Sequence, residues 1–161
     1  MRILGIDPGY GITGFGLVDA QRGQMTLLRC GAITTPAGMD FSARLEIIYE
    51  DLRKLLEMAK PDAVAIEELF FHNNQKTAIN VAQARGVLVL AAKNKGIPVY
   101  EYTPLQVKQA VVGYGRAEKS QVQQMTKTIL GLTEIPKPDD TADALAIAVC
   151  HAHSNNSAYR F

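Results

Sequence analysis

Four acidic residues stand at positions from which their carboxylates could meet in one site. They are Asp7, Glu67, Asp140 and Asp143. Asp7 and Glu67 each end a short apolar segment, where an unpaired charge among desolvated neighbours is costly. Asp140 and Asp143 are three residues apart, so on a helix they share one face. If these segments converge in the fold, the sequence predicts a cluster of four carboxylates.

Such a cluster needs compensating charge, because each ionised carboxylate raises the pKa of the others. Mg²⁺ or Mn²⁺ can provide this charge, since both prefer hard oxygen ligands and keep positions open for water and phosphate. Two such ions roughly 4 Å apart can activate water as a nucleophile and stabilise a departing oxygen. The chemistry that this cluster suits is therefore hydrolysis of a phosphodiester bond.

Three of the four acids also have ordinary structural explanations. Asp7 precedes a Pro-Gly turn, Asp140 could cap a helix, and Asp143 could complement the helix dipole in the first turn. Glu67 lacks such an explanation. Composition and spacing alone leave both a metal site and a set of structural acids open.

The segments that carry the acids fit an alternation of strands and helices. Strands are expected over residues 2–7, 11–19, 25–34, 62–67 and 97–102. Helices are expected over residues 41–59, 75–95, 104–112, 118–130 and 140–153, with Thr103 as an N-cap and Pro104 at the first helical position. Short connections favour an antiparallel meander at the start, followed by alternating helix and strand. This order predicts an α/β fold with a mixed five-stranded sheet, in which Asp7 and Glu67 end their strands at the edge where functional groups gather.

Composition predicts one domain over residues 1–161, because 47% hydrophobic and 20% charged residues are ordinary usage for a chain of this size. The apolar stretches fall short of the roughly 20 residues of a membrane span. Cys30 and Cys150 are far apart and show no zinc-binding spacing, which favours a reduced, cytoplasmic chain. The net charge of +1 looks low for a nucleic-acid enzyme, but acids gathered in a metal site would leave a basic excess elsewhere.

Several segments match, in order, the pattern of one known family. They are Gly5-Ile-Asp-Pro-Gly9, Thr13-Gly-Phe-Gly16, Ala65-Ile-Glu67, Gln83-Ala-Arg-Gly86, Gln106-Val-Lys-Gln109, Val112-Gly113, Ala117-Glu-Lys-Ser-Gln121 and Asp140-Thr-Ala-Asp-Ala-Leu-Ala146. Over almost its whole length the chain resembles the RuvC family of Holliday junction resolvases, nucleases of the RNase H-like superfamily. The resemblance implies the RNase H-like fold and two Mg²⁺ ions per active site, with Mn²⁺ as a substitute.

The resemblance also assigns roles to individual residues. The metal-binding acids of the family fall on Asp7, Glu67, Asp140 and Asp143. The neighbouring Glu68 and Asp139 do not match the pattern, and Glu68 should point to the opposite side of its strand.

The family's supporting lysines fall on Lys108 and Lys119, and its base-stacking phenylalanine falls on Phe70. The lysines would hold DNA phosphates and stabilise developing charge. As alternatives, both could be solvated helix lysines, and Phe70 could be a packing residue.

The substrate and partners follow from the resemblance alone. It implies a DNA four-way junction cut by a symmetric homodimer, with Arg85 and Gly86 on the dimer helix, and cooperation with a RuvA–RuvB branch-migration complex in recombination and repair. The carboxyl terminus departs from the pattern, since some members of the family carry a longer basic tail. Two other functions are possible: a non-catalytic junction-binding relative, and an ATP-handling protein of the sugar kinase and actin kind.

Two groups of residues are expected to have no catalytic role. Gly11, Gly14 and Gly16 lack the spacing of a phosphate-binding loop, and we interpret them as sites of close backbone packing in a strand. His151 and His153 are expected on the surface near the end of the last helix.

Overall fold

The computed structural model describes the backbone of residues 1–69 and 75–156, and the side chains of the same residues up to 154. Within them, five strands form one sheet in the order β3-β2-β1-β4-β5. The strands are β1 (Arg2–Asp7), β2 (Ile12–Gln21), β3 (Gln24–Thr34), β4 (Ala63–Glu67) and β5 (Val99–Tyr102). The β1–β2 and β2–β3 pairs are antiparallel, whereas β1–β4 and β4–β5 are parallel. The predicted mixed α/β sheet is confirmed.

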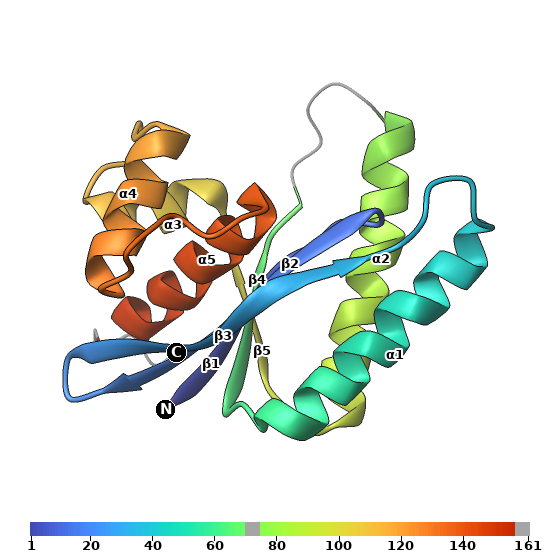
Figure 1. Cartoon of the computed structure of the whole chain (residues 1–161), viewed down its shortest axis with the longest axis horizontal. Helices are drawn as coiled ribbons and strands as arrows, with labels where there is room; N and C mark the ends of the chain where they lie inside the picture. Colours follow the sequence, from blue (N-terminus) through green and yellow to red (C-terminus); the bar gives the residue numbers. More distant parts are fainter. Residues whose placement is uncertain (70–74, 157–161) are drawn as a thin grey trace.

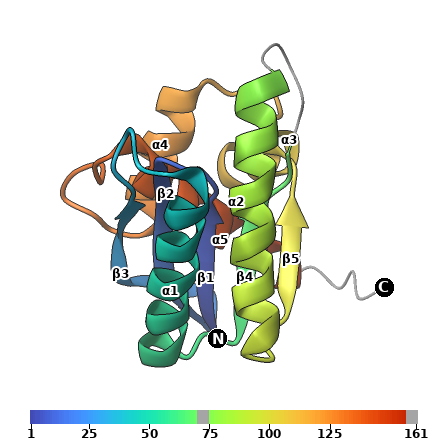
Figure 2. The ribbon, with the colours of Figure 1, turned by 90° about the vertical axis from the view of Figure 1, so that its right-hand side faces the viewer.

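Helices cover both faces of this sheet (Figures 1 and 2). On one face lie α1 (Phe41–Ala59) and α2 (Gln75–Asn94); on the other lie α3 (Pro104–Val112), α4 (Lys119–Ile129) and α5 (Asp139–Asn156). The expected helices agree with these bounds to within three residues at each end. Thr103 caps α3 in a capping box with Gln106, and Pro104 occupies the first turn, as expected. None of the described helices is long and apolar enough to cross a membrane.

Strand alternation decides which acids face which layer. Leu4 and Ile6 of β1 pack against α1 and α2, whereas Ile3 belongs to the core under α5. Successive side chains of a strand point to opposite faces, so Asp7 shares the α5 face with Ile3. In β4 the same alternation puts Glu67 on the face of Ala65, which also packs in the α5 core. The two strand-ending acids therefore emerge under the same helix.

Glycines bring α5 close to the sheet. A Cβ on Gly14 would lie 2.0 Å from the carbonyl oxygen of Asp140, and one on Gly16 would meet Leu145. The expected close packing at these two glycines is confirmed, and Gly5 packs in the same way against Ala144. Gly11 differs, because it precedes β2 and its nearest neighbour is the end of the flexible Arg44 side chain. Small residues thus let the amino end of α5 settle beside the end of β1.

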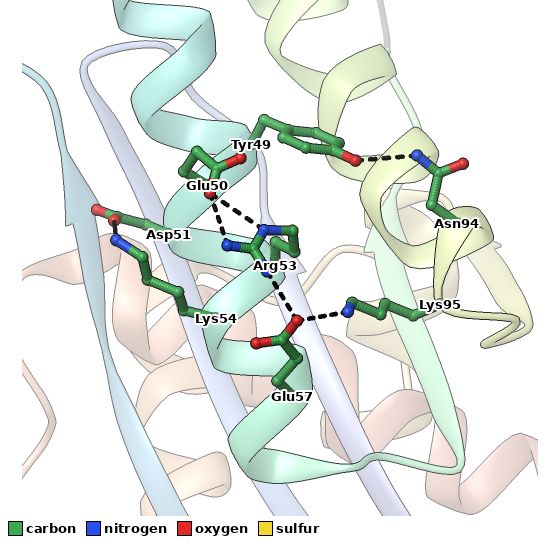
Figure 3. Close-up of polar contacts among 8 residues, drawn as sticks. All are labelled: Tyr49, Glu50, Asp51, Arg53, Lys54, Glu57, Asn94 and Lys95. Atoms are coloured by element: carbon green, nitrogen blue, oxygen red, sulfur yellow. Dashed lines mark hydrogen bonds and ion pairs between the residues drawn. The ribbon is translucent and has the colours of Figure 1, made fainter.

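Polar side chains join the two helices of the opposite layer (Figure 3). Arg53 of α1 pairs with Glu50 and, at 2.7 Å, with Glu57 of the same helix. Glu57 also forms an ion pair at 2.5 Å with Lys95, which lies just beyond α2. The Tyr49 hydroxyl accepts a hydrogen bond from the Asn94 side chain at 2.9 Å. These contacts, together with the apolar packing beneath them, fix the carboxyl end of α2 against α1.

The expectation of a surface position was wrong for His151, which is only 2% exposed. Its Nδ1 and the Tyr102 hydroxyl oxygen lie 2.6 Å apart. The centroid of its ring lies 4.5 Å from the ring centroid of Tyr100. The carboxyl half of α5 is buried because β5 and α3 pack against it, and this burial lowers the pKa of His151. His153 is exposed, as expected.

Candidate active site

The four acids meet at the carboxyl ends of β1 and β4. Asp7 is the last residue of β1 and Glu67 the last of β4, and the two strands are parallel neighbours. The first turn of α5 lies against this edge of the sheet and carries Asp140, with Asp143 one turn further on. Three elements that are distant in the sequence thus deliver four carboxyl groups to one place.

The electrostatics of Asp7 show how closely the acids gather. The pKa of Asp7 is raised from its ordinary 3.8 to about 8, mainly by burial and then by the charges of Glu67, Asp143 and Asp140, in that order. Lys119 opposes this rise. Because its pKa responds to three other acids, Asp7 is the centre of the cluster. With a pKa of about 8, Asp7 is largely protonated at neutral pH unless a cation compensates the charge.

Glu67 and Asp143 experience the same environment. Burial is the main cause that raises the pKa of each, and the charge of Asp143 adds to the rise at Glu67. Lys119 lowers both pKa values, at Asp143 through a hydrogen bond. The cluster is therefore a partly buried, mutually repelling set of acids that Lys119 partly compensates.

Lys119 is the first residue of α4, and its ammonium group faces the cluster. Its Nζ lies 3.1 Å from Oδ2 of Asp143 and 3.8 Å from Oδ2 of Asp139. The hydrogen bond with Asp143 is the main cause that raises the pKa of Lys119, so the side chain stays cationic. The structure thus pairs Lys119, which the family resemblance marks as a supporting lysine, with one of the four acids.

A pocket of about 200 Å³ opens beside the acids. Its polar walls are Glu67, Asp143, Lys108 and Lys119, and Val107 and Ile147 are among its apolar walls. The structure therefore brings Lys108, which comes from α3, to the same opening as two of the acids. A negatively charged group entering here would meet two ammonium groups on one side.

The two neighbouring acids are more exposed than the four of the cluster. Glu68 is exposed beyond the end of β4 and is not among the charges that raise the pKa of Asp7. Asp139 is exposed and pairs with Lys137 at 2.7 Å, which lowers its pKa. Asp139 nevertheless borders the cluster, because it also lies 3.8 Å from the Lys119 ammonium group.

Comparison with known proteins now identifies the family. The sequence model described as crossover junction endodeoxyribonuclease RuvC matches residues 3–151. The chain belongs to the RuvC family. A RuvC relative named crossover junction endodeoxyribonuclease, from Caldanaerobacter subterraneus subsp. tengcongensis, is 58% identical over 156 residues, which cover 97% of this chain and 94% of the relative. This membership makes the chain an endodeoxyribonuclease by family and removes the ATP-handling alternative.

Solved structures agree with the RuvC assignment. Thermus thermophilus RuvC in complex with a Holliday junction substrate superposes with a TM-score of 0.92 at 40% identity, covering 96% of this chain and 94% of that one. The yeast mitochondrial Holliday junction resolvase Ydc2 superposes with a TM-score of 0.68 at 15% identity over 94% of this chain and 79% of that one, a likeness of fold alone. The predicted RNase H-like fold is confirmed.

Membership of the RuvC family implies use of a divalent metal. Within residues 1–69 and 75–154, no group of three Asp, Glu, His or Cys side chains is arranged so that it could hold a metal ion without rearrangement. The donor set nevertheless fits such an ion, because it consists of carboxylate oxygens whose mutual repulsion a divalent cation would relieve. Phe70, the predicted base-stacking residue, lies outside the described residues.

One hydrogen bond at this site could not be predicted from the sequence. Arg85, interpreted from the sequence only as a residue of the dimer helix, donates from Nε to the backbone carbonyl oxygen of Glu67 at 3.1 Å. The Gln83–Gly86 motif marks the segment, but no spacing within it indicates a bond to a strand end. Only the packing of α2 against the sheet shows this contact.

Proposed function

We propose that this chain resolves DNA four-way junctions by paired, symmetric nicks, as a single nuclease domain over residues 1–161. One observation supports this most strongly: the RuvC-family chain has its acids in one partly buried cluster, with Asp7 at the centre and a raised pKa of about 8. The pKa of Asp7 stays raised despite Lys119, so the cluster favours further compensation by protons or hard divalent cations. Hydrolysis that leaves 5′-phosphate and 3′-hydroxyl ends is the corresponding chemistry.

In this proposal the metal ligands are the four acids: Asp7, Glu67, Asp140 and Asp143. Two Mg²⁺ ions, or Mn²⁺ in their place, would supply activation of water and stabilisation of the departing oxygen. Lys108 and Lys119 line the pocket beside Glu67 and Asp143, so they can hold the DNA backbone and stabilise charge as the bond breaks. Phe70 is proposed to stack on an unpaired base near the junction centre.

The proposed assembly is a homodimer formed through α2. Ile79 and Leu90 are 55% and 53% exposed, and they lie on one helical face with the exposed Gln83 and Gly86. A Cβ on Gly86 would meet nothing within 4 Å, so the face has room for a second helix. Two-fold symmetry of the protein would match that of the junction, so each of the two DNA strands that are cut would have its own active site.

A charge on this α2 face is expected to give a monomer. Leu90→Glu would bury an unpaired carboxylate in the dimer interface, which favours separation of the subunits. Light scattering after gel filtration should report the monomer mass, and junctions should lose their paired nicks. The matched control is Met58→Glu on α1, where the side chain is 63% exposed and removed from this face. A dimeric Leu90→Glu protein would exclude this interface.

The cellular setting belongs to the same proposal. The relatives named above include bacterial proteins, and the family resemblance supports a cytoplasmic role in DNA recombination and repair with a RuvA–RuvB complex as partner.

The test of function is cleavage of a synthetic four-way junction beside a linear duplex of the same sequence. With Mg²⁺, the protein should nick two opposite strands of the junction symmetrically and leave the duplex largely intact. Binding of the junction without cleavage in Mg²⁺ or Mn²⁺ would instead support the non-catalytic alternative. Equal cleavage of duplex and junction would retain a nuclease but remove junction selectivity.

A further inference from the structure

Arg85 of α2 reaches the end of the strand that carries Glu67. Its side chain is only 17% exposed. Nε donates to the Glu67 carbonyl oxygen at 3.1 Å, and NH2 forms an ion pair with Oε1 of Glu101 in β5 at 2.8 Å. One buried guanidinium therefore joins a helix to the ends of two neighbouring strands.

The Glu67 carbonyl needs a donor of this kind. The parallel pairing of β1 with β4 ends at Ile6 and Ile66, one residue before Glu67. Beyond it, Asp7 is followed by Pro8, which has no N–H and cannot extend the pairing. The carbonyl would lack a partner on the β1 side, and a buried unpaired carbonyl is unfavourable. Arg85 supplies the missing donor from the helix layer.

On its other side, the end of β4 is held by β5. Glu67 pairs with Tyr102, and the N–H of Glu68 donates to the Tyr102 carbonyl at 2.9 Å. With the contact from Arg85, the backbone at Glu67 is held from both sides at the point where the strand ends. The direction of a side chain follows the backbone that carries it, so these bonds also orient the Glu67 carboxyl group.

From this geometry we infer that Arg85 is a positioning residue for the metal site. It holds the backbone at Glu67 so that the carboxylate is presented to the cluster with Asp7 and Asp143. This inference rests on the proposed function, because it takes Glu67 as a metal ligand. Partners that orient metal ligands matter almost as much as the ligands themselves, and their loss lowers metal affinity by roughly tenfold or more.

Arg53 offers a matched comparison within the same layer of helices (Figure 3). It also has two polar partners, but both are carboxylates of α1, Glu50 and Glu57, away from the strand ends that carry Asp7 and Glu67. A lost Arg53 removes helix contacts only. Substitution of Arg85 removes the hydrogen-bond donor to the backbone of Glu67, a proposed metal ligand. Comparing the two substitutions therefore distinguishes an effect on the position of Glu67 from a general loss of stability.

The test is Mn²⁺ affinity, measured by electron paramagnetic resonance of the free ion on the full-length protein well below its melting temperature. Arg85→Met should raise the Kd for Mn²⁺ roughly tenfold, whereas Arg85→Lys should recover part of the loss because it keeps one donor. Glu101→Gln leaves the bond to Glu67 in place and should change Kd less than Arg85→Met. Arg53→Met should leave Kd within about twofold of the wild-type value. Circular dichroism and gel filtration establish that each variant is folded and has the wild-type subunit number.

Two kinds of failure are distinguishable. If the wild type binds Mn²⁺ and cuts junctions but both Arg85 variants bind Mn²⁺ normally, the positioning role is wrong and the proposed function stands. The positioning role is also wrong if Arg53→Met weakens Mn²⁺ binding as much as Arg85→Met. If the wild type neither binds Mn²⁺ nor cuts junctions, the proposed function is wrong, and the inference about Arg85 is overturned with it.

Discussion

Asp7→Asn is expected to abolish junction cleavage and, at the same time, to stabilise the metal-free protein. The loss of cleavage should be about 10³-fold or more, equivalent to roughly 4 kcal/mol of transition-state stabilisation, because the central ligand of the cluster loses its charge. Single-turnover cleavage of a four-way junction in Mg²⁺ measures this loss.

The gain in stability follows from the raised pKa of Asp7. The folded protein holds the proton until about pH 8, whereas the unfolded chain releases it near the ordinary 3.8. The folded state therefore binds the proton more tightly, and the free energy of unfolding falls as pH rises between these two values. A tenfold change in proton affinity corresponds to about 1.4 kcal/mol. At pH 8, Asp7→Asn should therefore be more stable than the wild type, and each 1 kcal/mol gained should raise Tm by about 2 to 4 °C for a chain of this size.

Thermal unfolding in a metal chelator at pH 5 and at pH 8 checks this prediction. From pH 5 to pH 8 the wild type should lose stability relative to Asp7→Asn, a comparison in which the opposite contribution of the buried His151 cancels. Asp139→Asn serves as the control, since Asp139 is an exposed acid whose pKa is lowered by Lys137. An Asp7→Asn protein that melts below the wild type at pH 8, or that still cuts junctions at the wild-type rate, would contradict the proposed role of Asp7.

Lys119→Met is expected to reduce cleavage by about 10²-fold, the usual effect of removing one preorganised charge from an active site. Lys119 is the positive charge that opposes the repulsion at Asp7, Glu67 and Asp143, so its loss raises the pKa of all three carboxyls. The protein should therefore need a higher pH to reach its full rate. The profile of cleavage rate against pH, at a fixed Mg²⁺ concentration below saturation where protons and Mg²⁺ compete for the carboxylates, measures both effects.

Lys137→Met is the matched control for Lys119. Lys137 also pairs with Asp139, but it is largely exposed and is not among the charges that lower the pKa of Asp7. Its loss should leave the pH profile of cleavage unchanged. If Lys119→Met behaves like Lys137→Met, then Lys119 is a solvated helix lysine and takes no part in the reaction.

Much of the fold follows from local patterns in the sequence. The apolar spacing after Asp40 predicted residues 41–59 as a helix, and α1 has these bounds. Apolar runs that end in acid predicted β1 and β4 with their carboxylates at the strand ends. These predictions succeed because periodicity and turn residues are local properties of the chain.

His151 shows where local patterns fail. The middle of the last helix, Ala144–Cys150, is wholly apolar, so its sequence does not indicate which side is covered. Burial of His151 depends on Tyr100 and Tyr102 of β5, which are about 50 residues away in the chain. Contacts of this kind come from tertiary packing alone.

The candidate site was predictable in composition but not in its contacts. The choice of Asp7, Glu67, Asp140 and Asp143 among neighbouring acids required the family resemblance, because spacing left structural explanations open for three of them. The ion pair of Lys119 with Asp143 and the bond from Arg85 to Glu67 depend on how α4 and α2 pack. Neither leaves a pattern in the sequence that separates it from ordinary helix residues.

The most direct test of the central claim is an anomalous difference map from crystals of the protein soaked in Mn²⁺. The four acids are proposed to bind divalent cations, so anomalous density should lie among the carboxylates of Asp7, Glu67, Asp140 and Asp143 and should disappear in Asp7→Asn crystals soaked in the same way. Mn²⁺ density at other residues but not between these acids, in crystals of protein that cuts junctions, would contradict the claim.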